Sequence, residues 1–497
     1  MTGQRDDARL VTTGLYIDGA AVSASDRGSY EIFNPARPDE LVGRAAAATE
    51  QDADAAVQAA HRAFPQWSRL HYAERAAMLR EVARLLVEDP VDVEHRSQLF
   101  TREHGKVRRE TLLEITRLGE RFTQCADFAE RLAQDERIPG PPFDTVVTRQ
   151  PRGVAVLIVP WNWPLAILGA KLPQALMAGN TVVVKPAENA ALVPTLTLHR
   201  IAAALPPGVL NVVTGSSARI GDVLTGHALT RFVNFTGSVA IGRHVMRTAA
   251  NHLTPVTLEL GGNDPGLVLQ DAVLDEAAFN RLYLAAFMST GQICMALKRL
   301  YVHRSRFDEV VEGLMGVMAR QVVGDGLLPE TTMGPLNNEK QLRVVTGMIE
   351  EARAAGADVR ESGQLGDEAL YRRGYFQRPT LVVGPDPRLR VVREEQFGPV
   401  LPILPFDTEQ EAVALANDSE FGLCSSVWTP DRDRAVAIAR QLEAGYTYLN
   451  AHGPSAQDGR GPFGGFKNSG IGRNLGYEGV VQFQGYHCIS GPAGWLV

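Results

Sequence analysis

The feature that most restricts the fold of this chain is a regular alternation of strand and helix patterns that begins near residue 153. Short β-branched runs alternate there with segments whose apolar residues recur at helical spacing. Strands are expected at 153–159, 181–185, 210–213 and 231–235, and helices at 164–177, 193–204, 218–224 and 239–250. Such an alternation predicts a doubly wound parallel sheet with helices on both faces.

A second alternation covers residues 256–450. Strand patterns occur at 300–303, 400–404 and 424–429, and helical patterns occur at 305–320, 339–354 and 409–417. The chain has 497 residues, a length that allows about three domains. We therefore expect an α/β protein with two doubly wound lobes.

Four further segments lie outside these alternations. Residues 1–13 have no regular pattern and are expected to be loose, residues 50–135 are expected to be helical, and residues 145–149 read as a short alternating strand. The tail after residue 478 is apolar and aromatic. Because such tails are rarely left in water, we expect this one to pack on a second subunit.

Composition and charge exclude several classes of function. The chain has 50 basic and 57 acidic residues, a net charge of −7, and no long basic run, so nucleic-acid binding is not expected. No apolar stretch is long enough to cross a bilayer, and the N-terminal residues lack the charge and apolar core of a signal peptide. We expect a cytoplasmic protein without a membrane partner.

The four cysteines and 11 histidines show no spacing typical of metal ligands, so no metal site is expected. Cys125, Cys424 and Cys488 are predicted to be small buried hydrophobic residues. Cys294 is a candidate nucleophile, because a cysteine thiolate attacks carbonyls readily. It ends the run Phe287-Met-Ser-Thr-Gly-Gln-Ile-Cys, in which Gly291 is expected to let the backbone approach a ligand.

Glu259 is a candidate general base. It lies between Leu258 and Leu260 and is followed by two glycines. Apolar surroundings raise the pKa of a carboxyl group, which suits a base that works near neutral pH. If the segment is a strand, however, Glu259 points away from the face of the two leucines, and an exposed side chain stays an alternative.

Asn162 is the third candidate. It lies in the run Pro160-Trp-Asn-Trp-Pro164, between a predicted strand and a predicted helix. A side-chain amide in such a rigid loop can stabilise a developing oxyanion. The alternative is an asparagine that caps the helix beginning at Pro164.

Together these motifs resemble those of the aldehyde dehydrogenase superfamily, in its hydrolytic, NAD(P)-dependent form. The Cys294 run resembles the cysteine signature of that family, Leu258-Glu-Leu-Gly-Gly262 its glutamate signature, and the Asn162 loop its oxyanion-hole motif. Two further matches are Glu395-Gln-Phe-Gly-Pro399 and Pro462-Phe-Gly-Gly-Phe-Lys-Asn-Ser-Gly-Ile-Gly-Arg473. The motifs follow the family's order between residues 15 and 490.

The resemblance implies a domain division and an oligomer. A Rossmann-like NAD-binding domain would comprise residues 1–133 and 152–257, and an α/β catalytic domain residues 258–447, with residues 448–477 returning along the cleft. Residues 134–151 and 478–497 would form a small β oligomerisation element. The protein is expected to be a homodimer or a homotetramer.

A dinucleotide site is expected where the strand at 181–185 ends. Its last residue, Lys185, lies at the edge where α/β sheets bind ligands. Glu188 follows, and a carboxylate there can accept both hydroxyls of an adenine ribose and repels a 2′-phosphate. By resemblance, the two residues hold that ribose, so NAD is favoured over NADP; the alternative is a surface ion pair.

The rest of the cofactor site also rests on the resemblance. The run Phe235-Thr-Gly-Ser238 opens a helix, whose backbone N–H groups suit a pyrophosphate. Glu395 would bind the nicotinamide ribose and Phe397 would pack near the nicotinamide ring, unless both only support the loop at Gly398. The other expected cofactor residues are Ile158, Pro160, Trp161, Gly215, Phe235, Thr236, Gly237, Ser238, Leu260 and Gly261.

The resemblance further implies oxidation of an aldehyde to a carboxylate with NAD. Cys294 would attack the carbonyl, and Asn162 with the backbone N–H of Cys294 would stabilise the oxyanion of the thiohemiacetal. After hydride transfer to NAD, water activated by Glu259 would hydrolyse the thioester. The alternatives are a CoA-acylating or semialdehyde-specific dehydrogenase of the same fold, a nucleotide-independent thiol esterase, and a non-catalytic scaffold.

One position departs from the family pattern. Many members carry a glutamate where this chain has Asn474, and that glutamate, with a lysine matching Lys171, has been proposed to relay protons. Asparagine cannot ionise, so we expect Glu259 to exchange its proton directly with water.

The expected substrate tunnel is apolar. It would be lined by Trp163, Ile167, Met288, Ile293, Met295 and Phe463. These side chains favour an uncharged aliphatic or aromatic aldehyde. The alternative is that the same residues are ordinary members of the hydrophobic core. The loop at 450–463 is longer than the family pattern, and His452 or Arg460 in it could instead bind an anionic aldehyde.

Overall fold

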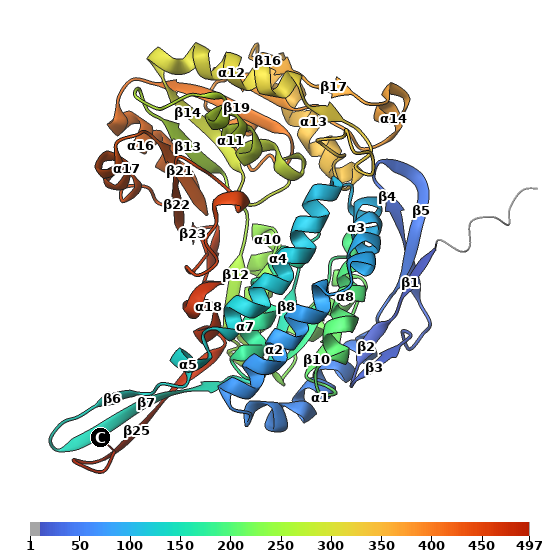
Figure 1. Cartoon of the computed structure of the whole chain (residues 1–497), viewed down its shortest axis with the longest axis vertical. Coiled ribbons are helices and arrows are strands. Elements are labelled where there is room, and N and C mark those ends of the chain that lie inside the picture. The colour runs from blue at the N-terminus through green and yellow to red at the C-terminus, as the bar shows by residue number, and fades with distance from the viewer. Residues whose placement is uncertain (1–9, 497) are drawn as a thin grey trace, which may run out of the picture.

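The computed structural model describes residues 10–496, which form two lobes and a long projecting sheet (Figure 1). Each lobe is built around a largely parallel sheet with helices packed against it. This architecture confirms the predicted α/β fold with two doubly wound lobes. The division into domains at the predicted boundaries stays a prediction.

The sheet of the first lobe has eight strands in the order β24-β12-β11-β8-β9-β10-β2-β3. The five strands from β12 to β10 run parallel to one another, and the outer strands run antiparallel. Every residue of β9 is buried, as expected for a β-branched central strand of a parallel sheet. The strands are β2 (Leu15–Ile17), β3 (Ala20–Val22), β8 (Val154–Ile158), β9 (Thr181–Lys185), β10 (Leu210–Val212), β11 (Thr230–Thr236), β12 (Val256–Glu259) and β24 (Gly470–Ile471).

The helices of the first lobe come from three parts of the chain. The predicted helical segment at 50–135 forms α1 to α5, which pack beside the helices that connect the strands (Figure 1). The helices are α1 (Glu50–Ser68), α2 (Tyr72–Val87), α3 (Pro90–His104), α4 (Arg108–Ala126), α5 (Ala129–Leu132), α6 (Pro164–Gly169), α7 (Leu172–Met177), α8 (Leu192–Ala203), α9 (Ser217–Thr225), α10 (Val239–Ala249) and α18 (Gly476–Val481).

The sheet of the second lobe has seven strands in the order β16-β18-β19-β14-β13-β21-β22. All neighbouring pairs are parallel except β16 with β18. The strands are β13 (Asp264–Val268), β14 (Leu297–His303), β16 (Asp358–Glu361), β18 (Thr380–Val383), β19 (Val400–Phe406), β21 (Cys424–Trp428) and β22 (Tyr446–Leu449). The helices are α11 (Glu276–Phe287), α12 (Phe307–Ala319), α13 (Glu339–Ala354), α14 (Glu368–Arg373), α15 (Arg390–Arg393), α16 (Glu409–Asn417) and α17 (Arg432–Ala439).

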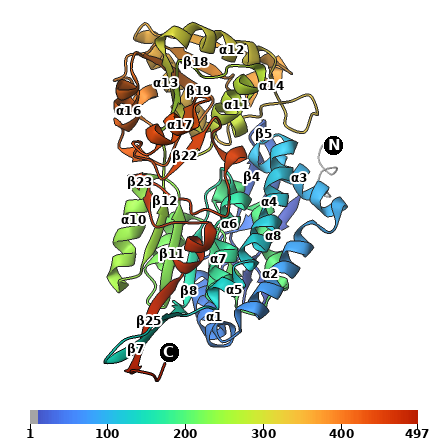
Figure 2. The same cartoon turned by 60° about the vertical axis from the view of Figure 1, so that its left-hand side comes forward.

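A three-stranded antiparallel sheet, β25-β7-β6, projects from the first lobe (Figure 2). Its strands are β6 (Glu136–Ile138), β7 (Phe143–Pro151) and β25 (Gln484–Pro492). Strand β25 pairs with β7 along its whole length, and large apolar side chains such as Phe143 and Tyr486 are exposed on this sheet. Packing of this sheet on a second subunit stays a prediction.

Smaller sheets complete the fold. One has the order β1-β5-β4, and two others pair β15 with β17 and β20 with β23. Their strands are β1 (Val11–Thr13), β4 (Ser29–Asn34), β5 (Arg37–Ala46), β15 (Val322–Val323), β17 (Gln364–Leu365), β20 (Phe421–Gly422) and β23 (Phe466–Lys467).

Three local predictions were wrong. The helix expected at 164–177 is two helices, because the ring of Pro173 prevents one continuous helix through Lys171. Part of the segment predicted to be loose is strand β1, which pairs with β5; residues 1–9 lie outside the described residues. Cys125 and Cys424 are buried as expected, but Cys488 is exposed, since it lies on the projecting sheet.

Within residues 10–496, no helix is long and apolar enough to span a membrane. The same residues contain no group of three or more histidine, cysteine, aspartate or glutamate side chains arranged to hold a metal ion.

Candidate active site

Cys294 lies where two hollows between the lobes meet. The first encloses about 690 Å³ and the second about 970 Å³, and both open to solvent. Asn162, Thr236 and Cys294 line both of them. A group bound in either hollow would therefore reach the same sulfur atom.

The segment before Cys294 has an unusual backbone. Ser289 and Thr290 have φ values of 54° and 58°, a left-handed conformation that costs free energy in residues with a side chain. A Cβ atom on Gly291 would lie 2.2 Å from the carbonyl oxygen of Gly398, so this glycine is required by contact with the protein's own backbone. That Gly291 also lets the backbone approach a ligand stays a prediction.

Burial dominates the electrostatics of Cys294. It raises the pKa of the thiol to about 12, and the nearby carboxyl groups of Glu395 and Glu259 act in the same direction. The Lys298 ammonium opposes them. Lys298 also donates a hydrogen bond of 2.8 Å to the carbonyl oxygen of Ile293, so it anchors the residue immediately before the candidate nucleophile.

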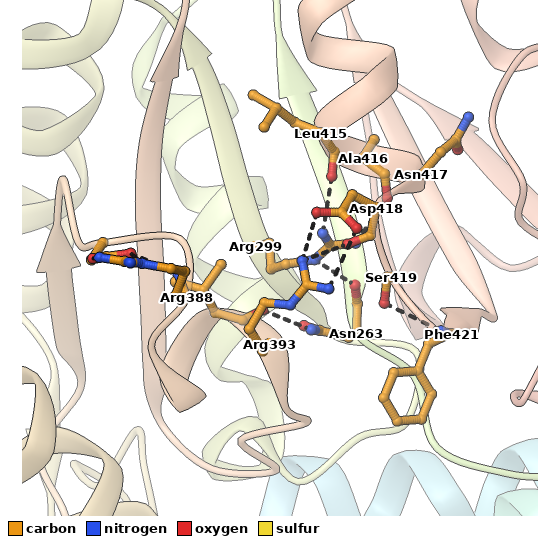
Figure 3. A network of polar contacts seen from close by, with 12 residues as sticks. Asn263, Arg299, Arg388, Arg393, Leu415, Ala416, Asn417, Asp418, Ser419 and Phe421 are labelled. Carbon is orange, nitrogen blue, oxygen red and sulfur yellow. Dashed lines mark hydrogen bonds and ion pairs between the residues drawn. The ribbon is translucent and has the colours of Figure 1, made fainter.

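A buried arginine connects the segment of Cys294 to that of Glu259. The Nε of Arg299 donates a hydrogen bond of 2.9 Å to the carbonyl oxygen of Asn263, which lies four residues after Glu259 (Figure 3). The same guanidinium donates to the carbonyl oxygens of Leu415 and Ala416, which the last turn of α16 leaves without helical partners. From β14, the strand that follows Cys294, this side chain thus ties the segment after Glu259 to the end of α16.

Glu259 ends strand β12 and lines the first hollow. It is only 5% exposed, which excludes the alternative of a solvent-facing side chain. Burial raises its pKa to about 8, while the charges of Lys171 and Arg473 oppose the increase. Within residues 10–496, neither carboxylate oxygen has a hydrogen-bond partner, so both are available to a molecule in the hollow.

The position of Glu259 depends on a glycine in the next strand. Gly470 of β24 pairs with Glu259 and has a φ of 149°. A Cβ atom at Gly470 would lie 2.0 Å from the carbonyl oxygen of Leu258. Any larger residue would therefore push the two strands apart at the candidate base.

The side chain of Asn162 is held toward the cysteine segment. Its Nδ2 donates a hydrogen bond of 2.9 Å to the carbonyl oxygen of Gln292, two residues before Cys294. The cap position of α6 is occupied by Trp163, and Glu114 accepts hydrogen bonds of 3.1 Å from the first-turn N–H groups of Leu165 and Ala166. Asn162 therefore does not cap the helix, and this alternative was wrong.

Lys171 is fully buried behind the reactive groups. Its Nζ donates to the Oδ1 of Asn234, whose Nδ2 in turn donates to the Oδ1 of Asn474 at 2.7 Å. Burial lowers the pKa of Lys171 to about 7, opposed by the negative charges of Glu259 and Cys294. Asn474 thus completes a hydrogen-bonded chain that begins at Lys171 and contains no carboxylate.

The second hollow is lined by most of the predicted cofactor residues. Those on its wall are Pro160, Trp161, Thr236, Gly237, Ser238, Leu260, Gly261, Glu395 and Phe397. Gly237 and Ser238 lie at the start of α10, so this helix N-terminus borders the hollow. Asn338, Lys340, Gln341 and Val344 of the second lobe also line it and were not identified from the sequence.

Two of these residues carry further interactions. Glu395 accepts a hydrogen bond of 3.1 Å from the N–H of Gly262, and burial raises its pKa to about 7, opposed by Lys298. Phe397 has a φ of 50° and meets the ring of Trp161 edge to face at 5.6 Å. The two lobes therefore contact each other across this hollow.

The remaining predicted cofactor residues lie outside the wall of that hollow. Ile158, Lys185 and Phe235 lie at or near the carboxyl ends of β8, β9 and β11, and Gly215 follows β10. Lys185 is buried, which lowers its pKa to about 8. Glu188 is exposed and accepts a hydrogen bond of 2.8 Å from the N–H of Ser217. The two side chains form no ion pair within the described chain, so the surface-pair alternative was wrong.

The first hollow has mostly apolar walls. Of the predicted tunnel residues, Trp163, Ile167, Ile293, Met295 and Phe463 line it. Met288 does not, although it packs on the same apolar cluster. His452 is buried beside Asp264, at 3.8 Å, and Arg460 is exposed and paired with Asp458, so neither lines this hollow as an anion site would require.

Two arginines in this hollow were not predicted from the sequence. Arg117 and Arg121 of α4 line it together with Pro454 and Gln457 of the loop at 450–463. They are one helical turn apart, so they share a face of α4. That spacing was visible in the sequence, but nothing there indicated which structure this face meets.

Comparisons with known proteins agree with this geometry. The model of the aldehyde dehydrogenase family matches residues 22–488. The chain is 37% identical to a glutarate-semialdehyde dehydrogenase of Pseudomonas putida over 98% of this chain and 100% of that one. It is 36% identical to a succinate-semialdehyde dehydrogenase [NADP(+)] of Escherichia coli over 97% and 99%.

Among solved structures, the fold is similar to that of an NAD-dependent aldehyde dehydrogenase from Sinorhizobium meliloti. The TM-score is 0.92 and the sequences are 31% identical, with 99% of this chain and 98% of that chain covered. With the matches of sequence and fold extending over nearly the whole chain, this protein belongs to the aldehyde dehydrogenase family.

Proposed function

We propose that this enzyme oxidises an aldehyde to a carboxylate with NAD, through a covalent intermediate on Cys294. The observation that carries the proposal is the position of Cys294 at the junction of two hollows. One contains Glu259 between apolar walls, which suits a substrate, and the other contains a helix N-terminus, which suits a dinucleotide phosphate.

The residues of the second hollow fit NAD. The N-terminus of α10 offers N–H groups to the pyrophosphate, and Glu395 and Phe397 offer a carboxylate and a ring to the nicotinamide end. When bound, NAD supplies the oxidising chemistry, since its nicotinamide ring accepts a hydride from the substrate.

Glu188 supports NAD over NADP. Its carboxylate is exposed just beyond the carboxyl end of β9, where a ribose hydroxyl can bind and a 2′-phosphate would be repelled. The relatives do not decide this choice, because one is named NAD-dependent and another carries NADP(+) in its name.

The residues of the first hollow would perform the covalent steps. The Cys294 sulfur attacks the aldehyde carbon after its proton passes to Glu259, the one carboxylate on the described wall of this hollow. The second N–H of the Asn162 amide and the backbone N–H of Cys294 then stabilise the oxyanion of the thiohemiacetal.

Hydrolysis completes the cycle. Glu259 first releases to the solvent the proton that it took from Cys294. Once the bound substrate is a thioester on Cys294, the Glu259 carboxylate takes a proton from water, and the resulting hydroxide equivalent attacks the thioester carbon. The Cys294 sulfur leaves as a thiolate, and Glu259 returns its proton to the solvent that enters the hollow.

Two further proposals concern the whole molecule. The projecting sheet β25-β7-β6 exposes large apolar side chains, which supports a homodimer or homotetramer built through it. A cytoplasmic location stays a prediction.

The test is NADH formation from the purified protein, NAD and a panel of aldehydes, without CoA. We expect turnover that Cys294→Ala abolishes and that the matched variant Cys488→Ala, on the projecting sheet, retains. Turnover only with CoA would show an acylating enzyme. Ester hydrolysis with no NAD binding would show a thiol esterase.

A further inference from the structure

The walls of the first hollow carry two positive charges that the proposed chemistry does not use. Arg117 and Arg121 are the only arginines on the described wall, and the surrounding side chains are mostly apolar. Arg121 is 6% exposed and Arg117 is half-buried. Burying a guanidinium in such surroundings costs free energy unless a partner compensates for it.

Neither arginine has a carboxylate partner within residues 10–496. Arg117 donates one hydrogen bond of 3.2 Å, to the carbonyl oxygen of Pro454. Arg121 donates to the amide oxygens of Gln124 at 2.9 Å and Gln457 at 3.4 Å. A guanidinium carries five N–H donors, so most of those on Arg117 and several on Arg121 are left for a ligand.

The remaining charges nearby do not neutralise the pair. Glu120 and Asp458 act on Arg121 from a distance; Glu120 is exposed to solvent, and the carboxylate of Asp458 is engaged by Arg460 at 2.6 Å. Glu259 is the one acid on the described wall, and burial keeps most of it protonated at neutral pH. Burial and the neighbouring Arg117 lower the pKa of Arg121, which stays charged because arginine pKa values lie far above 7.

The charges and the reactive atoms lie at different places on the wall. Cys294 and Asn162 lie at the junction of the hollows, whereas Arg117 and Arg121 lie on α4 beside the loop residues Pro454 and Gln457. The apolar side chains of Trp163, Ile167 and Phe463 line the same hollow. A molecule that carries both a carbonyl and an anionic group would present the first to Cys294 and the second to the arginines of the same hollow.

We infer that Arg117 and Arg121 bind an anionic group on the substrate, so that this enzyme acts on aldehydes bearing a carboxylate or a similar acid at the end opposite the carbonyl. This inference rests on the proposed function and names its substrate class. It replaces the uncharged substrate predicted from the apolar tunnel residues, because that prediction did not include the arginines. A planar guanidinium can bind a carboxylate through two parallel hydrogen bonds.

The test compares two aldehydes of equal chain length, 5-oxopentanoate and pentanal, in the wild-type enzyme with NAD. We expect kcat/KM to be at least about 10-fold higher for 5-oxopentanoate, since hydrogen bonds to charged groups contribute that much. Added salt should lower this preference by screening. Equal or better oxidation of pentanal would overturn the inference and leave the proposed function standing.

Variants assign the preference to the arginines. Arg117→Gln and Arg121→Gln keep an amide donor and remove the charge. Each should lower kcat/KM for 5-oxopentanoate by about 10-fold or more, mainly through KM, with a much smaller loss for pentanal. Arg121→Lys should recover part of the preference. Equal losses for both aldehydes would show a structural role and contradict the inference.

Arg109→Gln is the matched control. Arg109 belongs to the same helix, is exposed, and donates to the carbonyl oxygen of Thr332 away from the hollow. Arg109→Gln removes one positive charge, as Arg117→Gln and Arg121→Gln each do, and should leave the preference between the two aldehydes unaltered. A loss of preference in this variant would assign the effect to overall charge and contradict the inference.

Direct binding separates this inference from the proposed function. Calorimetry with pentanedioate, which carries the anionic group and no aldehyde, should show binding to the wild type that Arg121→Gln weakens by about 10-fold. If neither aldehyde is oxidised but this difference is observed, the proposed function fails and the anion site stands. Identical binding to both proteins would contradict the anion site.

Discussion

The side-chain amide of Asn234 donates a hydrogen bond of 2.7 Å to the amide oxygen of Asn474, 240 residues away in the chain. Through its own oxygen, Asn234 also accepts a hydrogen bond from Lys171. A buried ammonium is thus held near Glu259 by neutral partners, and its charge lowers the pKa of Glu259. We propose that Lys171 acts on the candidate base through this charge.

The first prediction concerns the pH dependence of hydrolysis. A general base works as a carboxylate, so hydrolysis should increase with pH around a midpoint of about 8, the pKa of Glu259. Lys171 has a pKa of about 7, so its charge lowers the pKa of Glu259 mainly at and below pH 7. Lys171→Met removes that charge, so kcat at pH 7 and below should decrease several-fold, with little change above pH 8. The measurement is kcat from pH 6 to 10; Lys467→Met, which removes a lysine paired with Glu443 outside the first hollow, should leave kcat at pH 7 unchanged.

The second prediction concerns Asn162. Replacing it with alanine removes one donor to the oxyanion, so kcat should decrease by about 10²- to 10³-fold. The affinity for NAD, measured by fluorescence titration, should change little, because Asn162 only borders the second hollow. A variant with near-normal kcat would exclude Asn162 as the oxyanion donor. In Asn162→Asp, a carboxylate replaces the amide and would repel the oxyanion, so kcat should be even lower than in Asn162→Ala.

The third prediction concerns the choice of dinucleotide. Glu188→Gln keeps the size of the side chain and removes the charge that would repel a 2′-phosphate. The ratio of kcat/KM for NAD over NADP should therefore fall by about 10-fold, on the scale of one charged hydrogen bond. Steady-state kinetics with both dinucleotides measure the ratio. A ratio that does not change would assign cofactor choice to other residues.

The fourth prediction concerns assembly. Tyr486 and Ile489 of β25 are 73% and 45% exposed. If the projecting sheet forms the subunit interface, the double variant Tyr486→Asp, Ile489→Asp should be a folded monomer by light scattering. Val91→Asp is the comparison, because Val91 is 77% exposed and lies on α3, outside the projecting sheet. An unchanged mass for the β25 variant would remove this sheet from the interface.

The sequence predicted the framework because β-branched runs in a parallel sheet leave a strong local pattern. Strand β9 begins and ends at the predicted residues, 181 and 185. The break before α7 was missed, although Pro173 was visible, because the apolar pattern continues across it.

Features of tertiary contact were not accessible from local patterns. A glycine is required at position 291 because Gly398 of another loop lies against it. The helical spacing of Arg117 and Arg121 does not show which part of the protein their face of the helix contacts. Free cysteines are usually buried, which is why Cys488 was predicted to be buried, but its strand belongs to a sheet that projects from the lobe. In each case the missing information was the position of a segment distant in sequence.

The most direct test of the account is the time course of NADH formation by Glu259→Gln, followed by stopped-flow absorbance at pH 8. The variant keeps the shape of the side chain but can no longer activate water for hydrolysis. Attack by Cys294 would then depend on thiolate formed without Glu259, so the account predicts a slowed burst equal to the concentration of active sites, followed by almost no turnover. Steady NADH formation near the wild-type rate, without a burst, would contradict the role of Glu259 as the base that releases the product from Cys294.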